Sequence, residues 1–318
     1  MNFLTAKLSH IYFTQQSIKD LLIDIDNYNI KIYTENKFLF INVKGENENQ
    51  DLFETFLYVY QILFLYLGCF PRIIELNQNG IISDNSEMVL KYNSSSNFES
   101  LNSVFVTIDE TTINAEIINK FKDLHPYPMY SMQYLVSDYY NHVVTNHKIT
   151  LLLHVIEGIF TNYLSKNEQK KAKQPDEKYL HYKNMVSYFC ERHFEKYDKK
   201  YNFEILKVLN KSSLDDFADA ISDTRNCYSH FSMNKQNKIT KGSESMIYFE
   251  LIYYICRMAI ISILGLNIDE NSIAEFYYSV HDWIVDVCEI KNEEYKSRTY
   301  KNDQLMKIIQ RKMQGLIE

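Results

Sequence analysis

The hydrophobic pattern of the chain changes near His125-Pro126-Tyr127-Pro128, a stretch that holds two of the four prolines. Proline removes a backbone donor and keeps the preceding residue out of the helical region. Short apolar stretches of strand length lie before this point, and longer stretches with helical spacing lie after it. The sequence therefore predicts an α+β chain, with a mixed α/β domain at residues 1–128 and an all-α domain at residues 129–318.

The first domain is predicted to contain one helix between several strands. The helix covers residues 51–67 and stops at Gly68, and residues 77–100, rich in Asn, Ser and Gly, are expected to form loops and hairpins. A turn is expected at Lys44-Gly45. The longest apolar run, residues 56–70, is shorter than the roughly 20 residues of a spanning helix and is interpreted as a core helix. The predicted strands are 30–33, 37–43, 71–76 and 104–108.

The second domain is predicted to be built from four main helices. The third opens at Ser212/Ser213, with acidic residues in its first turn, and the fourth ends at Gly265. The others cover residues 149–164 and 176–195, the fourth covers 243–264, and the tail adds candidates at 272–288 and 303–316. A lysine-rich loop, with Lys170, Lys171 and Lys173, is expected after the first helix. It is interpreted either as a solvated loop or as a patch for the RNA backbone.

Charge and cysteine usage narrow the function classes. The net charge of −7 argues against a protein that coats long nucleic acids, but it leaves room for a nuclease with a local basic patch. Five cysteines without a CxxC pair favour a reducing compartment, with neither a disulfide framework nor a thiolate zinc site. No signal-peptide layout is recognised at the start. The expected location is the cytoplasm, without a membrane partner, cofactor or metal.

The most informative motif is Arg225-Asn226-Cys227-Tyr228-Ser229-His230, at the end of the third predicted helix. Arg225 continues an apolar stripe, which is unusual for a residue that is rarely buried without a partner. Arg225 and His230 are five positions apart, about 140° around an ideal helix. They can converge only through the long arginine side chain, a distorted helix end, or a second copy of the chain.

These two side chains suit RNA cleavage. RNA carries its own nucleophile, the 2′-hydroxyl, so an enzyme needs a proton shuttle and a group that holds the anionic transition state. Histidine titrates near neutral pH and can move the proton. Arginine stays charged and binds phosphate oxygens with its forked N–H groups. This chemistry requires no metal ion.

The motif resembles the R-x4-6-H motif of the HEPN superfamily. Two further features resemble the ApeA-like branch: Ile156-Glu157 in the first helix, and a fourth helix in which Arg257 precedes Leu264-Gly265-Leu266. The resemblance implies a HEPN four-helix bundle that acts as a homodimer, with two motifs facing each other in one composite site. It also implies cleavage of tRNA or other structured RNA to a 2′,3′-cyclic phosphate, in anti-phage abortive infection.

The resemblance assigns Arg225 and His230 as catalytic and Asn226 as a polar residue that orients the site. Supporting roles are assigned to Tyr228 and to Glu157, which is expected to pair with Arg225 or Arg257. The N-terminal domain would sense a phage-derived trigger or position the substrate. In HEPN toxins modified by an adenylylating partner, a tyrosine follows the histidine by two residues; here that position is Ser232, which argues against such a partner.

Other interpretations remain open. The chain could be a HEPN dimer that binds RNA or a nucleotide without cutting it, the toxin of a toxin–antitoxin pair, or a scaffold that binds a protein through its aromatic-rich N-terminal domain. In a purely structural interpretation, Arg225 pairs with an acidic neighbour such as Asp223 or Glu157, and His230 only caps its helix.

Overall fold

The computed structural model describes residues 2–46, 49–83, 104–124, 145–172, 181–201, 205–208, 211, 213–230 and 243–287. The chain divides into two compact units. The first comprises Met1–Val143 and Ile260–Ile268, and the second comprises Val144–Ala259 and Asp269–Glu318. The expected boundary between residues 128 and 129 lies outside the described residues and stays a prediction.

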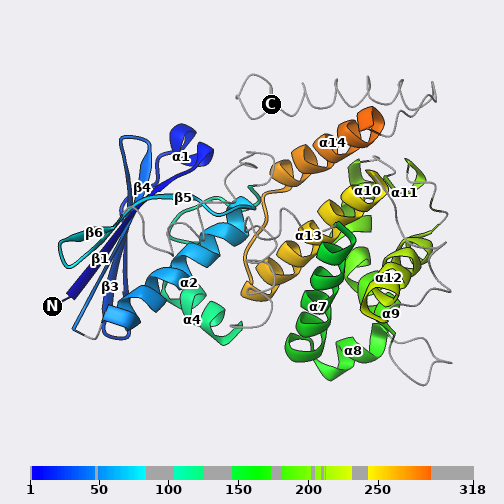
Figure 1. Cartoon of the computed structure of the whole chain (residues 1–318), viewed down its shortest axis with the longest axis horizontal. Coiled ribbons are helices and arrows are strands. Elements are labelled where there is room, and N and C mark those ends of the chain that lie inside the picture. The colour runs from blue at the N-terminus through cyan, green and yellow to red at the C-terminus, as the bar shows by residue number, and fades with distance from the viewer. Residues whose placement is uncertain are drawn as a thin grey trace. The chain divides into compact units, whose positions relative to one another are not determined.

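The first unit is built on a six-stranded antiparallel sheet with the strand order β2-β3-β4-β1-β5-β6 (Figure 1). The central strand β1 pairs with β4 on one side and with β5 on the other. The strands are β1 (Asn2–Ser9), β2 (Leu21–Ile25), β3 (Tyr28–Glu35), β4 (Phe38–Gly45), β5 (Arg72–Gln78) and β6 (Ile81–Ser83).

The strands form because apolar residues alternate along them and gather on one face. In β4, Leu39, Ile41 and Val43 are fully buried, the pattern of a half-buried strand. β3, β4 and β5 confirm three of the predicted strands. The predicted turn at Lys44-Gly45 is wrong, since both residues belong to β4. A Cβ at Gly45 would come within 2.7 Å of the Tyr28 ring on β3, so the glycine there provides close strand packing.

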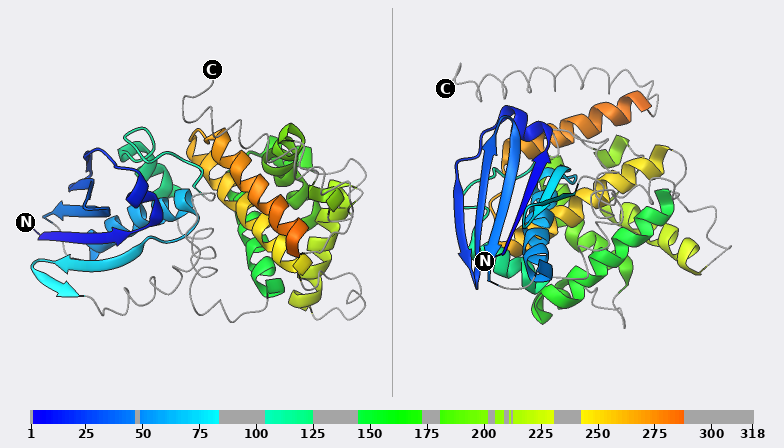
Figure 2. Two further views of the ribbon diagram at one scale, coloured as in Figure 1. Left: turned by 90° about the horizontal axis from the view of Figure 1, so that it is seen from above. Right: turned by 60° about the vertical axis from the view of Figure 1, so that its left-hand side comes forward.

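Helix α2 (Asn49–Leu67) lies along one face of the sheet (Figure 2). It ends at Gly68, whose φ of +83° is a conformation that favours glycine, as predicted. The predicted strand at residues 104–108 is wrong, although the segment is mostly buried. Its backbone bonds elsewhere: the Phe105 N–H donates to the Tyr66 carbonyl at the end of α2 (3.2 Å).

The short helices α1 (Ile11–Gln15) and α4 (Ala115–Leu124) complete the first unit. Neither they nor β1 and β2 are among the elements predicted above. α4 has a clear start signal, because the Asn114 side chain accepts the Ile117 N–H (3.0 Å). Of the expected loop region, residues 77–83 form the tight β5–β6 hairpin through Asn79 and Gly80, and residues 84–103 lie outside the described part.

The second unit is helical, which confirms the α+β prediction. Aromatic side chains join its main helices: Phe160 of α7 contacts Phe189 of α9, and Phe217 of α12 contacts Tyr248 of α13. Its elements are α7 (Thr145–Tyr163), α8 (Lys166–Ala172), α9 (Tyr182–Cys190), a π-helical turn η3 (Glu191–Glu195), α10 (Lys196–Tyr201), α11 (Ile205–Val208), α12 (Leu214–His230), α13 (Ser243–Leu264) and α14 (Glu270–Val287).

Two local predictions for this unit need correction. The second predicted helix does not end at residue 195, because helical backbone continues from α9 through η3 and α10 to Tyr201. The expected lysine-rich loop is a helix, α8, where it is described. Ser165 and Glu168 explain the helix: the Ser165 N–H and hydroxyl donate to the Glu168 carboxylate (3.1 and 2.8 Å) and the Glu168 N–H donates back (3.3 Å), which is a capping box.

The C-terminal helices match the prediction where they are described. α13 spans the predicted residues and ends at Gly265, with φ +77°. α14 lies beside α13 (Figures 1 and 2). The rings of Tyr254 and Phe276 stack between the two helices, with centroids 4.6 Å apart. The helix predicted at 303–316 lies outside the described residues. By length and composition Ser245–Leu264 could cross a membrane, but that stretch is mostly buried, which is equally typical of a core helix.

Candidate functional site

The site is placed by α12. Ser213 starts this helix by accepting the Asp216 N–H with its hydroxyl (3.2 Å), as the sequence predicts. Leu214, Phe217, Ala218, Ile221 and Thr224 are buried and hold the helix against its neighbours. Arg225 follows directly and is half-buried, while His230, the last helical residue, is exposed. The packing of α12 therefore carries the motif from the core to the surface.

Arg225 and His230 meet within one chain. The distance from Arg225 Nη1 to His230 Nε2 is 3.3 Å, and the same Nη1 donates to Asn226 Oδ1 at 3.1 Å. α12 stays helical through His230, so the long arginine side chain closes the gap. A guanidinium only donates, so Nε2 accepts here, and the imidazole in this arrangement is neutral with its proton on Nδ1.

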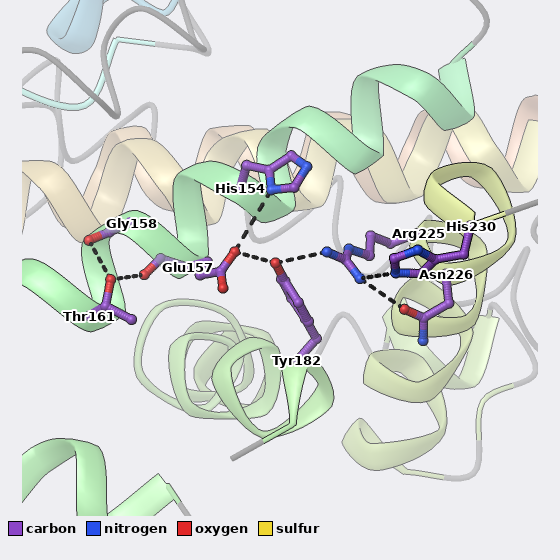
Figure 3. A network of polar contacts seen from close by, with 8 residues as sticks. All are labelled: His154, Glu157, Gly158, Thr161, Tyr182, Arg225, Asn226 and His230. Atoms are coloured by element: carbon purple, nitrogen blue, oxygen red, sulfur yellow. Dashed lines mark hydrogen bonds and ion pairs between the residues drawn. The ribbon is translucent and has the colours of Figure 1, made fainter. Parts of the chain in front are cut away.

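Tyr182, the first residue of α9, fixes the other end of the guanidinium. Arg225 Cζ lies 4.0 Å from the centroid of the Tyr182 ring, and Arg225 Nη2 donates to the Tyr182 hydroxyl at 3.0 Å (Figure 3). Burial first, and then the hydrogen bond to Glu157, raise the pKa of Tyr182 to about 12. The phenol therefore keeps its proton and can donate it onward.

The Tyr182 hydroxyl donates a hydrogen bond to the carboxylate of Glu157 on α7. His154, one turn earlier, brings Nδ1 to 3.8 Å from the same carboxylate. Glu157 thus reaches Arg225 through a tyrosine, and the expected direct pairing with Arg225 or Arg257 does not occur in the described part of the chain. Figure 3 shows the resulting series Glu157, Tyr182, Arg225 and His230, contributed by three helices.

Arg257 belongs to a different cluster. It is buried in α13, 2% exposed, and the charges of Arg257 and of Lys148 on α7 act on Glu250. Burial of the Glu250 carboxyl nevertheless raises its pKa to about 7, against the opposing effect of the two cations. The same α7–α13 region thus holds a second set of ionisable groups, apart from the motif.

The remaining sequence-predicted residues lie outside the network of Figure 3. Tyr228 packs edge-on against His147 of α7, with ring centroids 5.5 Å apart. Lys170 and Lys171 are exposed on α8, and Lys173 lies outside the described residues. Within the described residues, no group of three or more His, Cys, Asp or Glu side chains could hold a metal ion.

The sequence reasoning missed Tyr182 and His154, whose side chains contact the Glu157 carboxylate. Tyr182 is one of 26 tyrosines, and nothing in its local sequence marks it. His154 lies three positions before Glu157, so the helical repeat could have placed the two on one face. The contact that matters most, between Tyr182 and Arg225, joins residues 43 positions apart and depends on tertiary packing.

One donor of Arg225 remains without a partner. Its Nε is buried and has no hydrogen-bond acceptor among the residues that the structure describes. A buried donor without an acceptor lowers the stability of the folded chain, and most buried donors in proteins have an acceptor. The guanidinium is therefore incompletely satisfied by the described part of the chain.

Comparison with protein families supplies an assignment for this part of the chain. Residues 145–270 match the model of the family described as Apea-like HEPN. This segment is an ApeA-like HEPN domain. The matched HEPN segment runs from the start of α7 to the start of α14 and contains all the residues of Figure 3. Comparison with curated proteins and with solved structures found no match. The predicted resemblance to ApeA-like HEPN proteins is confirmed for residues 145–270.

Proposed function

We propose that the protein is a metal-independent HEPN endoribonuclease that cuts RNA through its own 2′-hydroxyl. The observation that carries the proposal is the 3.3 Å contact between Arg225 Nη1 and His230 Nε2. A permanent cation and a neutral imidazole side by side are the two groups that this reaction needs. The HEPN assignment of residues 145–270 supports the same function class.

In the proposed reaction, His230 Nε2 accepts the proton of the 2′-hydroxyl. The 2′-oxygen forms a bond to phosphorus, the bond from phosphorus to the 5′-oxygen breaks, and the leaving oxygen takes a proton from the imidazolium or from water. The products are a 2′,3′-cyclic phosphate and a 5′-hydroxyl. Charge builds up on the phosphate oxygens during this exchange, and the Arg225 guanidinium stabilises it.

Substrate binding would exchange partners around Arg225. Nη1 now donates to Asn226 and His230, and a phosphate oxygen is a stronger, charged acceptor than either. When Nη1 turns its N–H groups to phosphate, His230 Nε2 is released to act as a base. Asn226 is placed to hold the arginine between turnovers, which fits the orienting role expected from the sequence.

The wider biological role belongs to the same proposal. We place the enzyme in the cytoplasm, acting as a homodimer on tRNA or another structured RNA during anti-phage abortive infection. The N-terminal sheet unit would respond to a phage-derived trigger. The family assignment supports a HEPN nuclease in anti-phage defence as the general class.

The test is RNA cleavage by purified wild type and the variants Arg225→Ala and His230→Ala, in EDTA, with mapping of new 5′ ends and a test for cyclic phosphate. Both variants should lose cleavage while remaining folded and keeping the oligomeric state of the wild type. Arg192→Ala is the matched control, because Arg192 also lies over a tyrosine ring, that of Tyr188, at 4.3 Å. Full activity in both motif variants would overturn the proposal.

A non-cutting HEPN dimer is the main alternative. It would bind the same RNA with the affinity lowered by Arg225→Ala, but the RNA ends would stay intact in the wild type. The same assay, with a binding measurement added, separates the two functions.

A further inference from the structure

Tyr182 makes two different contacts with one guanidinium. Its ring face lies under Arg225 Cζ at 4.0 Å, and its hydroxyl oxygen accepts from Nη2 at 3.0 Å. The first contact limits how far the guanidinium plane can tilt, and the second limits how the group can rotate within that plane. Together they leave Nη1 directed toward His230.

The direction of every hydrogen bond in this series is fixed. Arg225 can only donate, so the Tyr182 oxygen accepts from it, and the single phenolic proton must then go to Glu157. Glu157 accepts this hydrogen bond as a carboxylate. Its negative charge also balances the positive charge of Arg225, from which the Tyr182 hydroxyl separates it. The Tyr182 hydroxyl thus uses its lone pair for Arg225 and its proton for Glu157.

The guanidinium is therefore divided into an anchored end and a working end. Nη2 is held by Tyr182, while Nη1 reaches His230 and Asn226. A lysine could not do both tasks, because its ammonium is a single point charge on a flexible stem. The division explains why an arginine with a tyrosine beneath it occupies this place.

We propose that Tyr182, with Glu157 as its acceptor, is a positioning residue that sets the orientation of Arg225 for RNA cleavage. The inference rests on the proposed ribonuclease function and adds a residue to its site. Tyr182 does not touch the reacting atoms; it acts through Arg225. Loss of its hydroxyl releases the anchored end, so the guanidinium samples orientations in which it no longer faces the phosphate.

The protein contains its own control for this idea. The Cζ of Arg192, on η3, lies 4.3 Å from the centre of the ring of Tyr188, on α9, and both side chains donate to Glu168 at 3.4 Å. This second cluster has the same three residue types but lies outside the motif. Tyr188→Phe removes the corresponding hydroxyl at a site that the proposal does not involve.

The kinetic test compares Tyr182→Phe, Glu157→Gln, their double variant and Tyr188→Phe. Tyr182→Phe should lower kcat by roughly 10- to 100-fold, the effect of a slightly misplaced catalytic group, with KM nearly unchanged. Glu157→Gln should act in the same direction. The double variant should be no worse than Tyr182→Phe, since both changes break one series. Tyr188→Phe should keep wild-type kinetics.

A readout that does not depend on cleavage accompanies the kinetics. NMR of the arginine guanidinium groups, assigned with Arg225→Lys, should show slow rotation of the Arg225 Nη groups in the wild type and faster rotation in Tyr182→Phe. Slow rotation that persists in Tyr182→Phe overturns the proposal. Wild-type kcat in Tyr182→Phe, while Arg225→Ala is inactive, also overturns it.

The two proposals fail in different ways. If wild type does not cut RNA, or if Arg225→Ala and His230→Ala both keep full activity, the proposed ribonuclease function is wrong and positioning for cleavage is wrong with it; the NMR result then shows whether Tyr182 still orients the guanidinium. If wild type cuts and Arg225→Ala does not, the ribonuclease function stands, and the Tyr182→Phe result decides the role of the tyrosine alone.

Discussion

Glu157 and Arg225 bind the same atom, the hydroxyl oxygen of Tyr182, one by accepting its proton and the other by donating to its lone pair. An acid on α7 and a base on α12 are thereby coupled through a residue of α9. The coupling makes three helices of the HEPN domain dependent on one another at the point where the motif reaches the surface.

This coupling predicts a stability effect for Glu157→Ala. The change leaves the Tyr182 hydroxyl without its acceptor, and the free energy of unfolding should fall by about 1 kcal/mol, a modest value because the Glu157 side chain is 40% exposed. Urea denaturation measures it. Asp219→Asn, on the exposed side of α12 and at the 4.0 Å limit of an ion pair with Lys183, is the control and should change stability by less than half as much. Equal effects would contradict the coupling.

The elevated pKa of Glu250 predicts a pH-dependent stability. Its carboxyl titrates at about 7 in the folded chain, compared with an ordinary value of 4.5. The protonated form is thus favoured by folding, and its contribution, fully present below about 4.5, is lost as pH rises through 7. Wild type should therefore lose stability from pH 5.5 to pH 8, while Glu250→Gln does not. The free energy of unfolding of Glu250→Gln minus that of wild type should rise by on the order of 2 kcal/mol over this range.

Thermal or urea unfolding of wild type and Glu250→Gln at the two pH values measures this gain. Glu116→Gln, at an exposed carboxylate on α4, serves as the control and should show the same difference from wild type at both pH values. A difference between Glu250→Gln and wild type that does not change with pH would refute the expectation.

In the proposed homodimer, the short Arg225–His230 distance predicts how dimers of two different variants behave. Because each chain forms its own pair, a dimer of one Arg225→Ala chain and one His230→Ala chain contains no complete pair and should stay inactive. The control is a dimer of wild type with the Arg225→Ala/His230→Ala double variant, which keeps one pair and should retain about half of the wild-type activity. Recovery of that level in the first dimer would mean that the pair forms between chains.

The exposed lysines of α8 predict a salt effect on RNA binding. If these lysines form the expected patch for the RNA backbone, replacing Lys170 and Lys171 by alanine removes two positive charges from it, so affinity should fall several-fold at low salt and the slope of log K against log salt should decrease by about 2. kcat should stay unchanged. Lys199 and Lys200, which pair with Glu195 and Glu270, are the control positions. An unchanged salt slope would leave α8 as an ordinary solvated helix.

Local signals at their ends mark several of the helices that could be predicted, although α4 and α8 carry such signals too and were missed. α2 and α13 stop at glycines with φ of +83° and +77°, and α12 starts at a capping serine. The strand predicted at 104–108 was wrong. The β-forming residues of this segment reflect its burial, and its Phe105 N–H donates to a carbonyl at the end of α2 instead of to a neighbouring strand.

Some residues of the candidate site could also be predicted from local sequence, and others could not. Arg225 and His230 stand out because five-residue spacing of a cation and an imidazole is a local pattern. Tyr182 does not, because its importance arises only when α9 packs against α7 and α12. The direct arginine partner expected for Glu157 was wrong for the same reason: charge alone suggested a salt bridge, and packing placed a phenol between the charges.

The division of α13 between the two units has a practical consequence for anyone who wishes to isolate the helical domain. A fragment of residues 129–318, the predicted second domain, would retain Ile260–Ile268 but lose nearly all of the residues with which they form a compact unit. Ile261, Leu264 and Leu266 are buried in the whole chain, and we expect the fragment to expose the part of their surface that the first unit covers. Such a fragment should aggregate, and residues 1–318 together are the appropriate material for studying the HEPN domain.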